Sequence, residues 1–176
     1  MLIKTIFAGF GGQGVLSMGL NLAMAAMLES KTVTYLPAYG AEVRGGTANC
    51  TVAISDEEIA SPVASSPEFV VAMNQPSMIR FQHQIQSGGL FFLNSSLIDA
   101  EIMRGDIDII KVPANGIAEE MGSPKSANMV MMGVFTKKSN LVSLESVIEG
   151  LAKALKGKQK LLAINKEALK AGYNLY

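Results

Sequence analysis

The first third of the chain alternates between apolar runs and glycine-rich turns. Residues 2–8 form an apolar run rich in β-branched residues that stops at a glycine cluster, which predicts a strand. Residues 15–28 carry apolar side chains on nearly every face, which predicts a helix covered on both sides. Residues 31–36 predict a second strand, which we expect Pro37 to terminate. This order of elements predicts a right-handed βαβ unit.

The rest of the chain predicts further strands and helices. Alternation between residues 47 and 55 indicates a strand with one buried face. Short apolar runs predict buried strands at residues 69–73, 90–93 and 107–112, and helices are predicted at residues 76–84, 115–121, 128–135, 144–155 and 166–171. The sequence shows no internal repeat and no linker, so residues 1–176 predict a single α/β domain with a mostly parallel sheet.

The composition is unusually apolar for a domain of 176 residues. Charged residues make up 17% of the chain, against about 25% in an ordinary soluble domain. A thick core and a large covered interface both explain this excess. We favour the interface, because the 11 methionines also suit adaptable contact surfaces. The chain is therefore expected to self-associate when it is expressed without its partners.

Charge and cysteine content exclude several classes of function. The 15 basic and 15 acidic residues balance, which argues against nucleic-acid binding. Cys50 is the single cysteine and His83 the single histidine, so no metal site and no iron–sulfur cluster held by this chain alone is expected. Residues 5–28 carry no charge, but glycines interrupt them, so we predict neither a membrane span nor a signal peptide. The expected location is the cytoplasm.

A glycine motif joins the first predicted strand to the first predicted helix. Its sequence is GFGGQG, and the candidate site residues are Gly9, Gly11, Gly12, Gln13 and Gly14. Glycines at this place let backbone N–H groups approach a phosphate at a helix N-terminus. The alternative is that they only permit a sharp turn. A dinucleotide site is not expected, because the second predicted strand does not end in the acidic residue that would hold a ribose.

A second candidate site follows the second predicted strand, and it contains Glu42, Arg44, Gly45 and Gly46. An arginine before two glycines can bind a phosphate or carboxylate through two parallel hydrogen bonds. The same charges can instead face a partner chain, and both uses remain open. The third candidate is Asn128, either a site residue or a helix cap.

The methionine-rich stripe that follows Asn128 is core or interface, and we favour interface. The sequence contains no Ser-His-Asp set, no paired catalytic carboxylates and no metal triad. We therefore expect no catalytic residue in this chain. Cys50 is expected to be a core residue, and His83 is expected to have no role in catalysis.

Taken together, residues 9–15 (GFGGQGV), 39–47 (YGAEVRGGT) and 128–130 (NMV) resemble the gamma subunit, or domain III, of 2-oxoacid:ferredoxin oxidoreductases. The resemblance covers nearly the whole chain, and the glycine motif is most similar to the 2-oxoglutarate and branched-chain enzymes. It implies a complex that oxidatively decarboxylates a 2-oxoacid, transfers the acyl group to coenzyme A and reduces ferredoxin.

The resemblance also implies partners, cofactors and fold. Alpha and beta subunits, with a ferredoxin-like delta subunit in some complexes, would carry thiamine diphosphate and the iron–sulfur clusters. This chain would bind no cofactor alone but would help to bind coenzyme A and to hold the complex together. The implied fold is a parallel sheet with helices on one side and a smaller antiparallel sheet, containing residues 47–55, on the other. The alternative function is a phosphate- or nucleotide-binding scaffold without a redox role.

Overall fold

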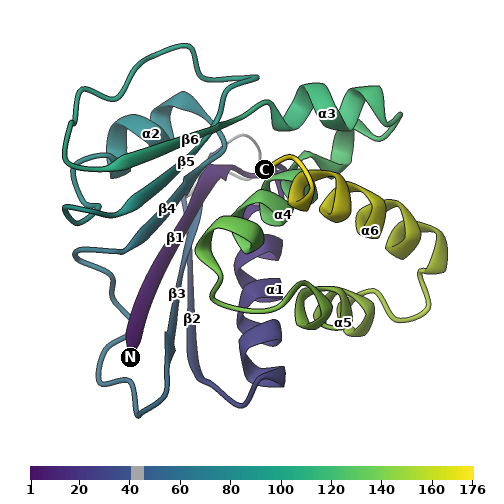
Figure 1. Ribbon diagram of the computed structural model, residues 1–176, viewed down its shortest axis with the longest axis horizontal. Helices are drawn as coiled ribbons and strands as arrows, with labels where there is room; N and C mark the ends of the chain where they lie inside the picture. The colour runs from purple at the N-terminus through teal and green to yellow at the C-terminus, as the bar shows by residue number, and fades with distance from the viewer. Residues whose placement is uncertain (41–45) are drawn as a thin grey trace.

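The computed structural model describes residues 1–40 and 46–176, which fold into one α/β domain (Figure 1). The strands are β1 (Leu2–Phe10), β2 (Thr32–Tyr39), β3 (Thr47–Ser55), β4 (Phe69–Ala72), β5 (Leu90–Asn94) and β6 (Asp108–Val112). The helices are α1 (Val15–Leu28), α2 (Gln75–Phe81), α3 (Ala114–Glu120), the 3₁₀ helix η1 (Pro124–Ser126), α4 (Ala127–Ser139), α5 (Leu144–Ala154) and α6 (Gln159–Tyr173). The predicted α/β class is confirmed. In this described part, every helix is too short or too polar to cross a bilayer.

The strands form one mixed sheet in the order β2-β3-β1-β4-β5-β6. Strands β1, β4, β5 and β6 are parallel, so the prediction of a mostly parallel sheet is confirmed. Strands β1 and β2 run in the same direction, as a βαβ unit requires, but β3 lies antiparallel between them. The expected separate antiparallel sheet is wrong. Strand β3 pairs with β1 along its whole length, from Leu2–Ser55 to Phe10–Thr47, and this continuous pairing extends the same sheet.

The two faces of the sheet are covered differently (Figure 1). The long helices lie on one side of the sheet, as expected. Helices α1 and α4 pack on the sheet, and α5 and α6 cover these two helices from outside. At the centre of this layer the ring of Phe135 lies 5.2 Å from those of Phe7 and Phe92, centroid to centroid. The opposite face of the parallel strands is covered by α2 and the segment that connects β5 to β6. Helices therefore lie on both sides, although α2 is the one helix of the described residues on its side.

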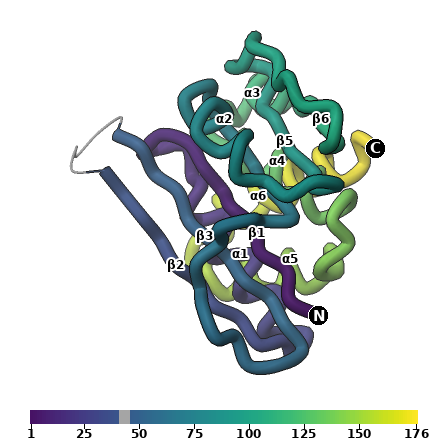
Figure 2. Tube along the Cα trace, turned by 90° about the vertical axis from the view of Figure 1, so that its left-hand side faces the viewer, coloured from purple at the N-terminus to yellow at the C-terminus, as the bar shows by residue number. Residues whose placement is uncertain are grey.

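Strand β2 is an edge strand and continues past Pro37 to Tyr39. Figure 2 shows β2 at the outside of the molecule, beside β3. The prediction that Pro37 ends the strand is wrong, because a proline on an edge strand does not need to donate a hydrogen bond to a neighbour. Helix α6 begins at Gln159 rather than at residue 166. Its first turns were missed because Leu162 is the only residue there that is buried.

Helices α4 and α6 touch through their backbones at two glycines. A Cβ atom on Gly133 would collide with the carbonyl oxygen of Leu169, and one on Gly172 would collide with the carbonyl oxygen of Val130. Helix α4 thus lies between the sheet and α6. The interface interpretation of the methionine stripe is wrong, because this position buries Met129, Met131 and Met132 inside the domain.

Candidate functional site

The carboxyl ends of β1, β4 and β5 meet at one edge of the sheet, because these strands are parallel. Ligands of open α/β sheets bind outside this edge. The glycine turn follows β1, Asn74 lies two residues after β4, and Asn94 is the last residue of β5. This edge therefore brings together a backbone turn and several carboxamide side chains.

The glycine turn requires glycine at residue 14. Gly14 has a φ of 73°, in the left-handed region that side chains disfavour. A Cβ atom at this position would also collide with the side chain of Asn128. Gly12 has a φ of 99°, and the N–H of Gln13 donates to the carbonyl oxygen of Phe10 over 3.1 Å, which closes the turn. The glycines thus serve a tight turn and a close approach to α4.

The amino end of α1 presents free hydrogen-bond donors. Gly14 is the N-cap residue, so no side chain caps the helix, and its first turn contains no acidic residue. Within the part of the chain that the structure describes, the N–H groups of Gly12 and Gly14 donate to no acceptor. A helix N-terminus of this kind carries a partial positive charge and favours an anion. The turn is therefore suited to a phosphate or carboxylate.

Gln13 fastens the turn to β4 rather than pointing to a ligand. Its Oε1 accepts from the N–H of Phe10 over 2.7 Å and from Nδ2 of Asn74 over 3.1 Å. Its Nε2 donates to the carbonyl oxygen of Met73 over 3.2 Å. All of these bonds hold the loop in place, so Gln13 is a positioning residue.

Two asparagines that the sequence analysis did not single out extend this network. Nδ2 of Asn94 donates to the carbonyl oxygen of Met73 over 3.2 Å and to Oδ1 of Asn115 over 2.8 Å. Oδ1 of Asn74 accepts from the N–H of Ser77 and caps α2. The signal that could have found Asn74 and Asn94 is their place at the ends of predicted parallel strands.

Asn128 joins the glycine turn from α4. Its Nδ2 donates to the carbonyl oxygen of Gly14 over 3.4 Å. The cap interpretation is wrong, because the N-cap of α4 is Ser126 and Asn128 lies inside the first helical turn. Two of the three predicted sites therefore meet, although Gly14 and Asn128 are far apart in the sequence.

Two cavities flank the glycine turn. One, of about 230 Å³, is lined by Gly12, Gln13, Met73, Asn115, Pro124, Lys125, Ala127 and Asn128. The other, of about 310 Å³, is lined by Phe10, Gly11, Gly12, Gly14, Val15, Leu16, Ser17 and Ala48. Lys125 is exposed, and among the described lining residues of these cavities it is the one with a charge. An anion at Gly12 would thus have a cation beside it.

A profile of the pyruvate ferredoxin/flavodoxin oxidoreductase family matches residues 4–175. The chain belongs to this family. Subunit VorA of ketoisovalerate oxidoreductase from Methanothermobacter thermautotrophicus is 41% identical over 97% of the chain, which spans 35% of that protein. Subunit KorC of 2-oxoglutarate synthase from Methanocaldococcus jannaschii is 35% identical over 90% of this chain and 88% of its own length. The chain thus spans most of the length of KorC and about a third of the length of VorA.

A solved structure supports the same assignment. The 2-oxoglutarate:ferredoxin oxidoreductase from Magnetococcus marinus, solved with 2-oxoglutarate, coenzyme A and succinyl-CoA bound, superimposes with a TM-score of 0.89. It is 26% identical, and the similarity covers 98% of this chain and 30% of that one. The resemblance to the gamma subunits of 2-oxoacid:ferredoxin oxidoreductases is therefore confirmed at the level of the family.

In this member of the oxidoreductase family, the second predicted site contacts the glycine turn through Gly46, its one residue that the structure describes. The N–H of Gly11 donates to the carbonyl oxygen of Gly46 over 2.8 Å. Glu42, Arg44 and Gly45 lie outside the described residues. The convergence of the two loops is thus observed at Gly46 and stays a prediction for the other three.

Cys50 and His83 lie away from this site. Cys50 is fully buried beside α1, and burial raises the pKa of its thiol to about 12, so the thiol is protonated at neutral pH. His83 is exposed after the end of α2. Among the described residues, no group of three His, Cys, Asp or Glu side chains is placed to hold a metal ion.

Proposed function

We propose that this chain is the gamma component of a 2-oxoacid:ferredoxin oxidoreductase and that it helps to bind coenzyme A. The observation that carries the proposal is the uncapped amino end of α1, which the glycine turn exposes beside Lys125. The family profile matches residues 4–175 around it. The complex oxidatively decarboxylates a 2-oxoacid, transfers the acyl group to coenzyme A and passes the electrons to ferredoxin.

The phosphate groups of coenzyme A suit the glycine turn. The N–H groups of Gly12 and Gly14 would donate to phosphate oxygens, and the helix dipole adds on the order of 0.3–1 kcal/mol. The Lys125 ammonium would contribute a charge-assisted hydrogen bond from the other side of the cavity. The structurally similar enzyme from Magnetococcus marinus was solved with coenzyme A, which supports this choice of ligand.

Partner subunits carry the chemistry in this proposal. The alpha and beta subunits hold thiamine diphosphate and, with a delta subunit where present, the iron–sulfur clusters. Exposed apolar side chains near the glycine turn favour a covering partner. Tyr39 is 70% exposed at the end of β2, and Leu36 and Phe10 are exposed nearby. In VorA, a similar sequence occupies about a third of a longer chain. This arrangement also favours close association of the present chain with other domains.

The oxoacid is a branched-chain 2-oxoacid or 2-oxoglutarate. The identity of 41% to VorA favours the branched-chain acid, and the identity of 35% to KorC keeps 2-oxoglutarate as the second candidate. We expect the contacts that select the oxoacid to belong largely to partner subunits. Comparing turnover of the two acids by the purified complex identifies the substrate.

Co-purification tests the proposal. We expect this chain, co-expressed with alpha and beta subunits of the oxidoreductase, to form a complex that contains iron and thiamine diphosphate. That complex should reduce ferredoxin with a 2-oxoacid and coenzyme A, while the chain alone should show no turnover. Native mass spectrometry and the ferredoxin assay measure both results. A chain that purifies free of partners, or turnover by the chain alone, would contradict the proposal.

Replacing Arg44 tests whether the second loop binds coenzyme A. Loss of a charged hydrogen bond costs about 1.5–3 kcal/mol, which corresponds to binding roughly 10- to 150-fold weaker. We expect Arg44→Ala to raise the KM of the complex for coenzyme A by that factor and to leave the KM for the oxoacid unchanged. Arg80→Ala, at an exposed position of α2, is the control. Unchanged coenzyme A kinetics with a weaker complex would assign the loop to subunit assembly.

A further inference from the structure

The two edges of the sheet are protected to different extents. Strand β6 carries Asp108 and Lys111, and the hydroxyl of Tyr176 donates to the carbonyl oxygen of Lys111 over 2.7 Å. Strand β2 forms the other edge, and none of its residues, TVTYLPAY, is charged. Within the part of the chain that the structure describes, no hydrogen bond ties another segment to the backbone on the outer side of β2. A long edge strand without charges is a template for pairing with another strand.

The backbone groups of β2 point alternately to β3 and to the outer side. The N–H of Gly40 donates to the carbonyl oxygen of Thr47 over 2.8 Å, and such hydrogen-bonded pairs recur at every second residue of β2. The residues between them, whose backbone groups point outward, are Val33, Tyr35, Pro37 and Tyr39. Because Pro37 has no N–H, its place in this set costs β2 no bond to β3. The other three residues present N–H groups at the edge.

Strand β2 is complementary to a second copy of itself. In an antiparallel pair centred on Leu36, Val33 lies opposite Tyr39 of the second copy, and Tyr35 lies opposite Pro37. Val33 and Tyr39 then exchange two hydrogen bonds, and Tyr35 donates to the carbonyl oxygen of Pro37. Every outward N–H of β2 thus has an acceptor. Centring the pair on Pro37 would set two prolines opposite each other, and centring it on Tyr35 would leave Tyr39 opposite a residue outside the strand.

The side chains also match in this register. Val33 and Tyr35 lie on the face of β2 that bears α1, where the exposed ring of Tyr39 would cover Val33 of the second copy. On the other face the two Leu36 side chains, each 40% exposed, would meet. Aromatic and β-branched side chains stabilise antiparallel strands when they lie opposite each other. Because β2 has no charge, no like charges meet along the pair.

We propose that two copies of this chain associate through β2, antiparallel about a two-fold axis at Leu36, and so form one continuous sheet. A two-fold contact uses the same surface on both chains, so it requires a surface that is complementary to itself. The register centred on Leu36 meets this requirement in its hydrogen bonds and in its side chains. The pairing also covers Leu36 and Tyr39, two of the exposed apolar side chains near the glycine turn.

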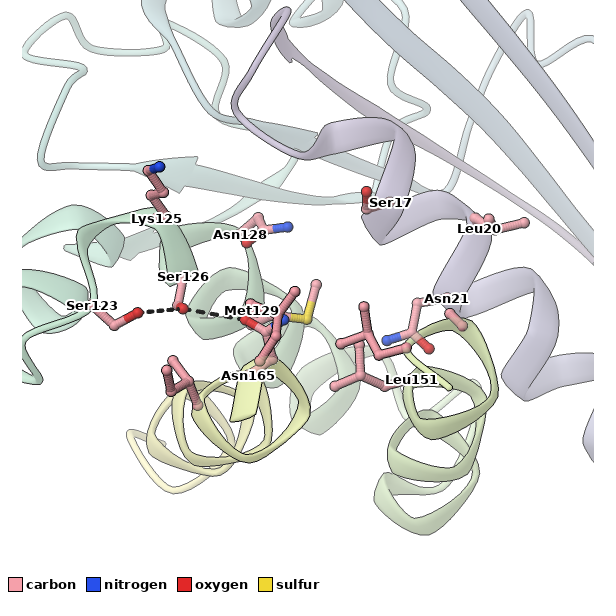
Figure 3. A pocket seen from close by; sticks show the side chains of 14 residues that line it. Ser17, Leu20, Asn21, Ser123, Lys125, Ser126, Asn128, Met129, Leu151 and Asn165 are labelled. Carbon is pink, nitrogen blue, oxygen red and sulfur yellow. Dashed lines mark hydrogen bonds between the residues drawn. The ribbon is translucent and has the colours of Figure 1, made fainter. Parts of the chain in front are cut away.

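The pairing leaves the cavities of the domain free. The largest cavity described, of about 570 Å³, lies between α1, α4, α5 and α6, and Asn21 of α1 is part of its wall (Figure 3). None of its described lining residues belongs to β2, and the same holds for the two cavities that flank the glycine turn. The inference is therefore independent of coenzyme A binding, and we expect saturating coenzyme A to leave the association unchanged.

Disulfide formation tests the register. Leu36→Cys places a thiol on the two-fold axis, where the Cα atoms of such a pair lie about 4.5 Å apart, a distance that a disulfide spans. The native thiol of Cys50 is buried and does not compete. With a mild oxidant, we expect a disulfide-linked dimer of the full chain carrying Leu36→Cys. Leu97→Cys, at an exposed position after β5, is the matched control and should stay monomeric under the same conditions. Equal linking in both variants, or none with Leu36→Cys, would overturn the inference.

Sedimentation of the full chain measures the association itself. A contact between two edge strands is small beside a standard interface of about 1,600 Å², so we expect the dimer to form at micromolar concentration. Leu36→Lys would set two ammonium groups against each other and should weaken the dimer at least tenfold. Ile79→Lys, at an exposed position of α2, should leave it unchanged. A wild-type chain that stays monomeric up to millimolar concentration, or a Leu36→Lys chain that dimerises as wild type does, would contradict the pairing.

The assembled complex distinguishes a second copy from another subunit. A benzophenone maleimide attached to Leu36→Cys links, on illumination, whichever chain lies beside β2. We expect mass spectrometry to find two copies of this chain in the product. A link to an alpha or beta subunit would overturn the inference and leave the proposed function intact. If the link joins two copies but the complex has no oxidoreductase activity, the pairing stands and the proposed function is wrong.

Discussion

Gly14→Asp should weaken the binding of coenzyme A by more than about 100-fold, or roughly 2.7 kcal/mol. Two effects add. The new Cβ atom collides with the side chain of Asn128 and displaces either the turn or the start of α4. The carboxylate then occupies the place where the free N–H groups and the helix dipole favour an anion of the ligand. The KM for coenzyme A of the assembled complex, or its Kd by calorimetry, measures the loss.

Two further variants separate the causes of this loss. Gly14→Ala keeps the collision without the charge, so it should weaken coenzyme A less than Gly14→Asp does. Gly88→Asp introduces the same side chain at a φ of 76°, where no atom lies within 4 Å of the new Cβ atom. It should leave coenzyme A binding unchanged. Equal affinity of wild type and Gly14→Asp would show that the glycine turn serves only the fold.

Gly172→Ala should lower the free energy of unfolding by about 3 kcal/mol or more, at or above the upper end of ordinary overpacking. The reason is that its Cβ atom would meet the backbone of Val130, which cannot rotate away as a side chain can. For a domain of this size, such a loss lowers the melting temperature by roughly 6–12 °C. Gly133→Ala should act in the same way, because its Cβ atom meets the backbone at Leu169.

Gly116→Ala is the matched control for these helix variants. Gly116 lies inside α3, and the nearest atom to a new Cβ atom there is Oγ of Ser96 at 3.8 Å. Alanine at an open helical position should stabilise the fold by up to about 1 kcal/mol. Thermal unfolding of the three variants checks the comparison. Wild-type stability of Gly172→Ala would mean that α4 and α6 do not pack through their backbones.

The site depends on the same contact between helices. Helix α4 carries Asn128, which donates to Gly14, and α6 holds α4 in place through Gly133 and Gly172. A shift of α4 would move the 230 Å³ cavity together with its lysine. We therefore expect any folded Gly172→Ala protein also to bind coenzyme A more weakly.

The sequence by itself determined those features whose signal is local. Alternation gave the bounds of β3 correctly, from Thr47 to Ser55, since each residue of a strand faces the opposite side from its neighbour. The expected single buried face is wrong, because β3 lies inside the sheet and every residue from Cys50 to Ser55 is buried. The glycine motif predicted a tight turn at Gly12 and Gly14, because no other residue adopts their backbone angles as readily. Its place before a helix predicted free N–H groups there.

The tertiary structure alone decided everything that depends on distant partners. The insertion of β3 between β1 and β2 arises from pairing with a distant segment, from Phe10–Thr47 to Leu2–Ser55, and no local pattern records it. Pro37 stays within β2 because that strand is at an edge, which only the order of the sheet defines. The methionines of α4 are buried because α6 covers them, and a helix that is apolar on all sides fits a core and an interface equally well. Asn21 reads in the sequence as an ordinary helical residue. The packing of α1 against α5 removes its amide from water, and no other described residue supplies a hydrogen-bond partner.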